Sequence, residues 1–380
     1  MITVCTVVNA VSTPITKFMG TAYDGPMATT LKDVAAHAGV SVKSVSNVIN
    51  NHPHISASLR ARVQTSLDAL GYRPNLAARQ LKHGRGGFIA LAVPQLDSPY
   101  FSELASNLSS LATRHGYILL LDITGADRAQ ERLAMSGMSG QMVDGVILSP
   151  LALTAAEIEA RDTATPLVLL GERAVPRDVD HVSVDSVAAS RAVGEYLLGL
   201  GRSRLAAIGR KPVEGTSSVR LRGFTAALSD AGVNIPQERV VRVRDFGRRH
   251  GYAAMQRLLD LPHSKRPDAV FAFNDLMAIG AMRAALERGV RIPEDVAIVG
   301  FDDIPESRYH TPSLTTVAPD LPLLAEAALA RLISTIEGRS AGPERVFIPW
   351  QLKIRESTED GTMTAIQERD AEVSRLSATR

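Results

Sequence analysis

Residues 30–50 read TLKDVAAHAGVSVKSVSNVIN, and this stretch decides the fold of the amino-terminal part of the chain. Thr30 and Asp33 have the spacing of a capping box, in which a hydroxyl and a carboxylate satisfy the free amides at the start of a helix. Apolar residues follow at helical spacing until Gly39, a residue that readily ends a helix. The stretch therefore predicts a short helix followed by a tight turn.

Two more helices are expected after this turn. Ser41 can cap the second helix, in which Val45, Val48 and Ile49 share one face. A third helix is expected over 56–71, capped by a serine and closed by a glycine. Three short helices, of which the first two are joined by a glycine turn, are typical of a helix-turn-helix domain.

A linker follows this head. Residues 74–86 begin with proline, favour helix as far as Lys82 and end in glycines. Isolated helices shorter than about 12–15 residues are marginal in water, so we expect a helix here to form only with a partner. Such conditional folding can couple the head to the state of the rest of the chain.

Beyond the linker, short apolar runs alternate with amphipathic stretches, as in parallel sheets covered by helices on both faces. The predicted strands are Phe88–Val93, Tyr117–Leu121, Val146–Leu148, Leu167–Leu170, Leu205–Ile208, Val240–Val243, Ala269–Phe273 and Val296–Val299. Eight strands with their helices are too many for a single hydrophobic core, so we expect two subdomains. The predicted fold class is thus a small all-α helix-turn-helix head plus an α/β core of two doubly wound parallel-sheet subdomains, with a ligand cleft at the carboxyl ends of the strands.

The formal net charge of +2 conceals an uneven distribution. Residues 27–85 carry eight basic and two acidic side chains, a balance of +6, whereas residues 86–380 carry 33 basic and 37 acidic ones, a balance of −4. A basic head on an acidic body favours a polyanionic partner for the head. A merely solvated basic face is the alternative on charge alone.

The first 26 residues show no helical or strand periodicity and lack the features of a secretory signal. We interpret residues 1–26 as a non-native leader before a natural start at Met27, or else as a disordered arm, and we expect a cytoplasmic protein. Cys5 is the only cysteine, which excludes an internal disulfide and a cysteine-based metal cage. No zinc-helix, phosphate-loop or nucleophile-elbow motif is present, so we expect no catalysis, cofactor or metal.

A series of ordered motifs resembles the lactose-repressor (LacI/GalR) family of bacterial transcriptional regulators. The motifs are LKDVA at 31–35, AGVS at 38–41, VSNVIN at 45–50, GYRPN at 71–75, FND at 273–275, VGFDD at 299–303 and PSLTT at 312–316. The match runs from about Thr29 to Arg355. The resemblance implies a repressor that binds palindromic double-stranded operator DNA as a homodimer, under the control of a small molecule, expected to be a carbohydrate.

The resemblance also implies a core like that of type I periplasmic sugar-binding proteins, and it suggests domain boundaries. The expected parts are the leader at 1–26, the DNA-binding head at 27–73, a hinge helix and linker at 74–86, an effector-binding and dimerisation core at 87–356, and a disordered tail at 357–380. Within the core, we expect the first subdomain at 87–183 and 317–348 and the second at 184–316 and 349–356. The tail lacks a heptad seam, which favours a dimer over a tetramer.

The second helix carries the side chains expected to read bases. A helix fits the major groove, where lysine and asparagine can read purine edges. By resemblance, Val42, Lys43 and Asn47 occupy base-reading positions, whereas a solvated polar face is the alternative. The other DNA contacts implied are Ser41, Ser46, Asn50 and His54 to the backbone and Ala78 and Leu81, the latter as a wedge, in the minor groove. The family commonly has arginine where Asn47 stands and threonine where Ser44 stands, so a different operator half-site is expected.

The resemblance implies a cleft lined by Tyr100, Phe101, Arg220, Phe246, Asn274 and Asp302. Charged and amide groups can bond adjacent hydroxyls in a fork while an aromatic face covers the C–H side of a sugar ring. Structural roles without a ligand are the alternative: Asp302 can cap a turn, Arg220 can be solvated and Phe246 can belong to the core. Glu172 lies where some relatives carry aspartate, so ligand identity does not transfer.

Two other functions are compatible with parts of this pattern. The same core can serve a sugar-binding transport or sensory protein that binds no DNA, and an enzyme can carry a DNA-binding head. The basic head and the lack of an export signal argue against the first. The lack of catalytic motifs argues against the second.

Overall fold

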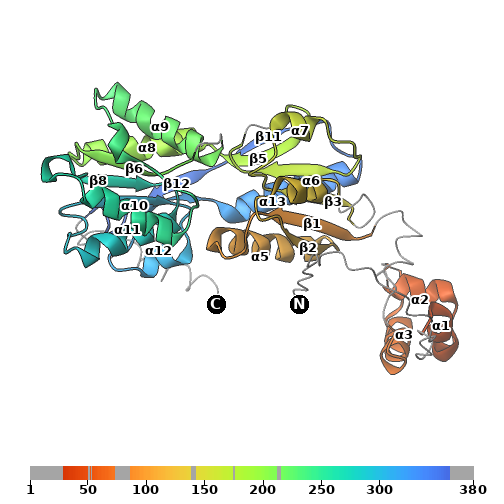
Figure 1. The fold of residues 1–380 in the computed structure, drawn as a ribbon. Coiled ribbons are helices and arrows are strands. Elements are labelled where there is room, and N and C mark those ends of the chain that lie inside the picture. Colours follow the sequence, from red (N-terminus) through yellow and green to blue (C-terminus); the bar gives the residue numbers. More distant parts are fainter. Residues whose placement is uncertain are drawn as a thin grey trace, which may run out of the picture. The chain divides into compact units, whose positions relative to one another are not determined.

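The computed structural model describes residues 29–49, 52, 54–72, 86–137, 143–173, 176–211 and 215–359. The chain divides into two compact units, a head whose described part ends at residue 72 and a core that begins at Gly87 (Figure 1). Within the described residues, no helix combines the length and the apolar character required to cross a bilayer.

Three helices surround a small apolar core in the head: α1 (Leu31–Ala38), α2 (Val42–Ile49) and α3 (Ala57–Ala69). The predicted capping box is confirmed, because the Asp33 amide donates to Thr30 Oγ1 at 3.4 Å and the Thr30 amide donates to the Asp33 carboxylate at 2.8 Å. Gly39 adopts a left-handed φ of 61°, which permits the tight turn into α2. The predicted helix-turn-helix is therefore confirmed.

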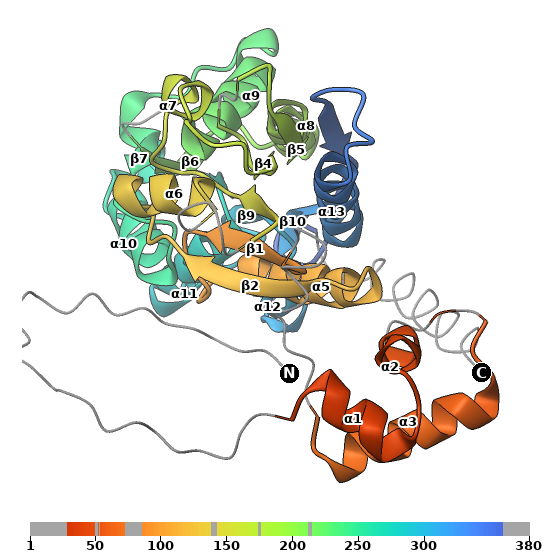
Figure 2. The same ribbon diagram turned by 90° about the vertical axis from the view of Figure 1, so that its right-hand side faces the viewer.

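The first subdomain of the core contains a six-stranded parallel sheet in the order β11-β5-β4-β3-β1-β2. Its strands are β1 (Phe88–Val93), β2 (Ile118–Ile123), β3 (Gly145–Leu148), β4 (Leu167–Leu170), β5 (Asp180–Val184) and β11 (Arg345–Ile348). Its helices are α5 (Pro99–Arg114), α6 (Arg128–Met135), α7 (Ala155–Glu159) and α13 (Leu321–Ile336). Apolar side chains of α5 and α13 pack on one face of the sheet, and those of α6 and α7 pack on the other (Figure 2).

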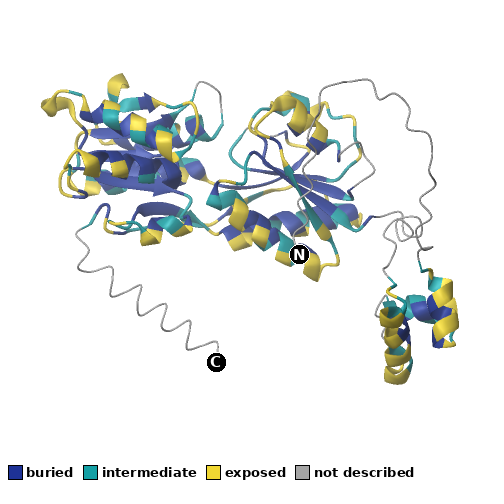
Figure 3. Cartoon of the chain, turned by 60° about the horizontal axis from the view of Figure 1, so that its bottom comes forward, coloured by how far each residue is buried: buried dark blue, intermediate teal, exposed yellow. Residues whose placement is uncertain are grey.

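The second subdomain also has six strands, in the order β12-β10-β9-β8-β6-β7. These are β6 (Leu205–Arg210), β7 (Val240–Arg242), β8 (Ala269–Ala272), β9 (Ala297–Phe301), β10 (Thr315–Pro319) and β12 (Trp350–Lys353). Its helices are α8 (Ser186–Gly199), α9 (Thr216–Asp230), α10 (Arg248–Leu259), α11 (Asp275–Glu287) and α12 (Pro305–Tyr309), with 3-10 turns η1 (Gln237–Arg239) and η2 (His263–Lys265). The pair α8 and α9 covers one face and the pair α10 and α11 the other, so the central strands are buried (Figure 3).

The chain passes between the subdomains three times, from β5 to α8, from β10 to α13 and from β11 to β12. The last two crossings lie side by side, where the Asp320 amide donates to the Pro349 carbonyl at 3.0 Å. Strand β12 enters the second subdomain one residue after β11, whereas β10 leads out of it, so these two strands run antiparallel. Every other described pair in this sheet is parallel. This pairing lasts to Pro319 and β5 lasts to Val184, so the boundaries expected at 317 and 184 move to 320 and 185.

The core extends past residue 356. Ser357 and Thr358 are buried, and the Thr315 amide donates to Ser357 Oγ at 2.8 Å. The expectation of a disordered tail beginning at 357 was therefore wrong for its first residues, which fill a place in the core. The remainder of that predicted tail, 360–380, lies outside the described residues.

A buried carboxylate ties the second subdomain together where its strands end. Asp275 accepts hydrogen bonds from Thr316 Oγ1 at 2.6 Å, Ser307 Oγ at 2.7 Å and the Ile304 amide at 3.0 Å. Burial raises the pKa of Asp275 to about 6, although these hydrogen bonds oppose the rise. Gly300 makes room for this group, because a Cβ there would lie 2.1 Å from Asp275 Oδ1.

Gly300→Ala should lower the free energy of unfolding by about 3 kcal/mol, because the added methyl group displaces the Asp275 carboxylate from its donors. Urea unfolding of the full chain, followed by circular dichroism, measures the loss. Gly199→Ala is the matched control, because nothing lies within 4 Å of its Cβ, and it should be neutral or slightly stabilising. An equal loss in both variants would contradict the close approach at Gly300.

Candidate functional site

The exposed face of α2 presents the side chains predicted to read bases. Val45 and Val48 are buried in the core of the head. Helical spacing therefore turns the opposite face outward: Val42 is 41 % exposed, Lys43 is exposed and Asn47 is partly exposed. One lysine and one asparagine are thus available on a single helix face.

The other predicted DNA contacts are distributed around this helix. Ser41 and His54 are exposed, and Ser46 is partly exposed. The Ser44 amide donates to Ser41 Oγ at 3.1 Å, so the predicted cap of α2 is confirmed. The predicted contacts Asn50, Ala78 and Leu81 lie outside the described residues.

A cavity of about 200 Å³ lies between the two subdomains, at the carboxyl ends of their strands. Its wall contains all six side chains predicted for the cleft: Tyr100, Phe101, Arg220, Phe246, Asn274 and Asp302. These residues come from α5, α9 and the segments that follow β7, β8 and β9. The parallel topology therefore collects at one place residues that lie up to 202 positions apart in the chain (302 − 100).

Arg220 is the centre of a cluster of charged side chains in the cavity wall. Its Nη2 and Nε lie 2.6 and 3.1 Å from Glu172 Oε1, and both side chains are less than 10 % exposed. Its Nη1 lies 3.7 Å from Asp302 and donates to the Phe273 carbonyl, and its guanidinium stacks 3.4 Å from the centre of the Phe301 ring. Because Glu172 follows β4 and Arg220 belongs to α9, this ion pair joins the two subdomains.

Asp302 is held in the cavity wall by an unusual backbone. Asp302 and Asp303 have φ angles of 119° and 52°, a region that costs free energy for residues with a side chain. Arg355 stabilises this turn through an ion pair with Asp303 at 2.6 Å. Burial raises the pKa of Asp302 well above its ordinary value, with Arg220 opposing the rise.

An aromatic wall faces part of the cavity. Lys211 Nζ lies 4.5 Å from the centre of the Phe246 ring, and burial lowers the pKa of Lys211 while Asp245 opposes the change. Asn274 donates from Nδ2 to the Phe246 carbonyl at 2.9 Å and accepts at Oδ1 from the Met277 amide at 3.0 Å. Asn274 therefore caps α11 and anchors the segment that carries Phe246.

Four charged residues of the cavity wall were not among the predicted contacts: Glu172, Arg173, Lys211 and Asp245. Glu172 follows β4 by two positions and accepts from Ser186 Oγ at 2.5 Å, and Lys211 directly follows β6. Asp302 was predicted from the family resemblance, but Glu172 and Lys211 also follow predicted strands, and this position could have revealed them. Burial raises the pKa of Tyr100, which keeps its phenol a neutral donor beside these charges.

The cavity wall combines charged side chains with aromatic rings. Arg220, Glu172 and Asp302 form one cluster of charged groups, and Tyr100, Phe101 and Phe246 contribute aromatic rings to the wall. In the part of the chain that the structure describes, no three histidine, cysteine, aspartate or glutamate side chains are grouped so as to hold a metal ion.

Comparison with known proteins assigns both units. Residues 30–75 match the family described as bacterial regulatory proteins, lacI family, and residues 195–358 match the periplasmic binding protein-like domain. The chain is 32% identical over 332 residues to the HTH-type transcriptional repressor CytR of Escherichia coli strain K12, which covers 87% of this chain and 96% of that protein.

Solved structures agree with these matches. The transcriptional regulator CelR in complex with cellobiose has a TM-score of 0.65 and 30% identity, covering 87% of this chain and 99% of that one. The Lac repressor dimer bound to operator and the anti-inducer ONPF has a TM-score of 0.75 and 27% identity, with the same coverage.

The head and the core thus match separately the two parts of one kind of regulator. The relatives are named as transcriptional regulators, not enzymes, and they align along nearly their whole length. The chain belongs to the LacI family of bacterial regulatory proteins, a family of DNA-binding transcriptional regulators.

Proposed function

We propose that the protein is a cytoplasmic repressor that binds a palindromic operator as a homodimer and responds to a carbohydrate in the cavity. The observation that carries the ligand class is the cluster of Arg220, Glu172 and Asp302 in a cavity whose wall also contains Phe246. Fixed charges can bond adjacent hydroxyls, and a ring can cover the C–H face of a sugar. The complex of the related CelR with cellobiose supports this class.

The place of the cavity suggests how a ligand controls DNA binding. Both subdomains contribute to its wall, so a ligand can favour one arrangement of the subdomains over another. It does so only when its affinities for the two arrangements differ, and such coupling is typically about 1–3 kcal/mol. In this proposal, the hinge at 74–86 transmits the change and folds against the minor groove with Ala78 and Leu81.

A thermal-shift screen of mono- and disaccharides, including cellobiose, should identify a saccharide that raises the melting temperature of the full chain. A ligand at a hundred times its dissociation constant stabilises the folded state by about 2.7 kcal/mol. Asp302→Asn should weaken binding of that saccharide about tenfold in isothermal calorimetry, because a hydrogen bond to a charged group contributes roughly 1.5–3 kcal/mol.

Glu306→Gln is the control for this measurement. Glu306 is a carboxylate on α12 that pairs with Arg248 at 3.1 Å and does not line the cavity. This variant should bind the saccharide as the wild type does. Failure of every saccharide to shift the melting temperature would contradict the proposed ligand class, and equal weakening by Glu306→Gln would contradict the proposed site.

Asn47→Ala should weaken binding to an inverted-repeat duplex selected from random sequence by about ten- to hundredfold, as expected for loss of a bidentate base contact. Binding to an unrelated duplex should change much less, because phosphate contacts are retained. Fluorescence anisotropy at one fixed salt concentration measures both affinities.

Gln64→Ala provides a matched control, because it removes an exposed amide from α3 and should leave both affinities unchanged. Equal losses on the two duplexes would show that Asn47 does not read a base. The absence of saturable, salt-dependent binding by the wild type would instead favour a sugar-binding protein that binds no DNA.

A further inference from the structure

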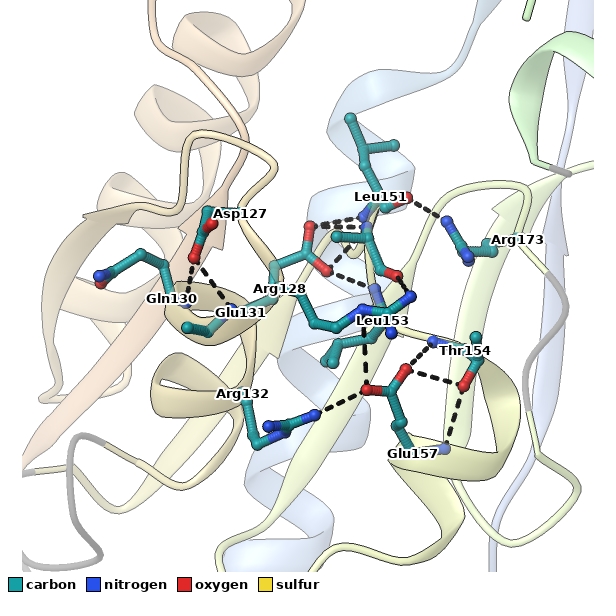
Figure 4. A network of polar contacts seen from close by, with 12 residues as sticks. Asp127, Arg128, Gln130, Glu131, Arg132, Leu151, Leu153, Thr154, Glu157 and Arg173 are labelled. Atoms are coloured by element: carbon teal, nitrogen blue, oxygen red, sulfur yellow. Dashed lines mark hydrogen bonds and ion pairs between the residues drawn. The ribbon is translucent and has the colours of Figure 1, made fainter. Parts of the chain in front are cut away.

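Another buried carboxylate, outside the cavity wall, lies in the first subdomain. Glu131, on α6, is fully buried and accepts hydrogen bonds from three consecutive backbone amides (Figure 4). The donors are Leu151 at 2.7 Å, Ala152 at 3.0 and 2.9 Å, and Leu153 at 2.9 Å. Both oxygens of one side chain thus satisfy a run of loop amides that belong to no strand.

These amides belong to the segment 149–153, which follows β3 and forms part of the cavity wall. Ser149, Pro150 and Leu151 all line the cavity, and Leu151 is 40 % exposed. The amides at 151–153 are wholly or partly buried, so the loop would be destabilised if they had no hydrogen-bond acceptor. The position of this part of the wall therefore depends on α6, the helix that carries Glu131.

The carbonyl groups of the same segment are also occupied. Arg173, itself in the cavity wall, donates to the Leu151 carbonyl, and Arg128 Nη2 donates to the Ala152 carbonyl at 3.4 Å (Figure 4). The backbone of Leu151 is thereby held from two sides, by the Glu131 carboxylate at its amide and by the Arg173 guanidinium at its carbonyl. A group clamped in this way has little freedom to adapt to a ligand.

We propose that Glu131 is a positioning residue for the ligand cavity. It fixes the backbone at 151–153 and thereby sets where the Leu151 side chain and the Ser149 hydroxyl meet a ligand. Its effect on ligand affinity rests on the proposed function, whereas its effect on the segment does not. Glu131 reaches the ligand only through this segment, because it does not itself line the cavity.

Glu131→Gln tests this role, because glutamine keeps the shape but turns an NH₂ group toward amides that need an acceptor. Hydrogen exchange of the full chain without ligand, read by mass spectrometry, should be about tenfold faster in a peptide that ends at residue 153 and so excludes the Thr154 amide, as expected for loss of roughly one charge-assisted hydrogen bond. Peptides covering β1 and β4 should keep their exchange rates.

Glu157→Gln is the matched control. Glu157 belongs to the same polar network and accepts from the Thr154 amide at 3.0 Å, but it contacts none of the three cavity amides. It should leave exchange at 151–153 unchanged. Unchanged exchange in Glu131→Gln, or equal acceleration throughout the first sheet, would overturn the proposal.

The affinity measurement uses the saccharide that most stabilises the wild type in the panel that includes cellobiose. Glu131→Gln should raise its dissociation constant about tenfold at a temperature well below the melting point, and Glu157→Gln should not. An unchanged constant despite faster exchange would overturn the positioning role. If no saccharide binds the wild type, the proposed function fails while the exchange measurement alone decides whether Glu131 holds the segment.

Discussion

The buried guanidinium group of Arg220 needs negative charges beside it, and the side chains around it in the cavity wall supply them. Arg220 receives its main counter-charge from Glu172, which belongs to the other subdomain, and a second one from Asp302. Removing one partner of a buried pair costs about 3–5 kcal/mol, although the intact pair adds little net stability. The pair therefore acts chiefly on geometry, because it keeps two separately folded sheets in one mutual arrangement at the point where a ligand would lie.

Two buried carboxylates outside the cavity wall, Glu131 and Asp275, both accept hydrogen bonds from backbone amides that follow a strand. Glu131 holds the amides after β3, and Asp275 holds the Ile304 amide after β9 together with two hydroxyls. Backbone amides just beyond a parallel strand have lost their sheet partner, so a buried acceptor must replace it. Residues that touch no ligand thus determine the shape that a ligand meets.

Much of the fold could be predicted from the stretch at 30–50 and from eight apolar runs, each of which forms a strand. The strands β5, β10, β11 and β12 were not predicted, because polar residues interrupt them and their pairing depends on the crossings between subdomains. The cavity residues Asn274 and Asp302 were predicted from the family resemblance, and both follow strands. Glu131 gave no such signal, because its partners begin 20 residues further along the chain and nothing local reveals them.

Three covalent connections between the subdomains have a mechanical consequence. A single linker would allow two lobes to swivel in any direction, whereas three connecting segments restrict the directions in which the lobes can move. The contact between Asp320 and Pro349 couples two of those connections, so neither can twist alone. One proteolytic nick at any crossing would leave both fragments associated, because the remaining two connections and the buried sheets still hold the lobes together.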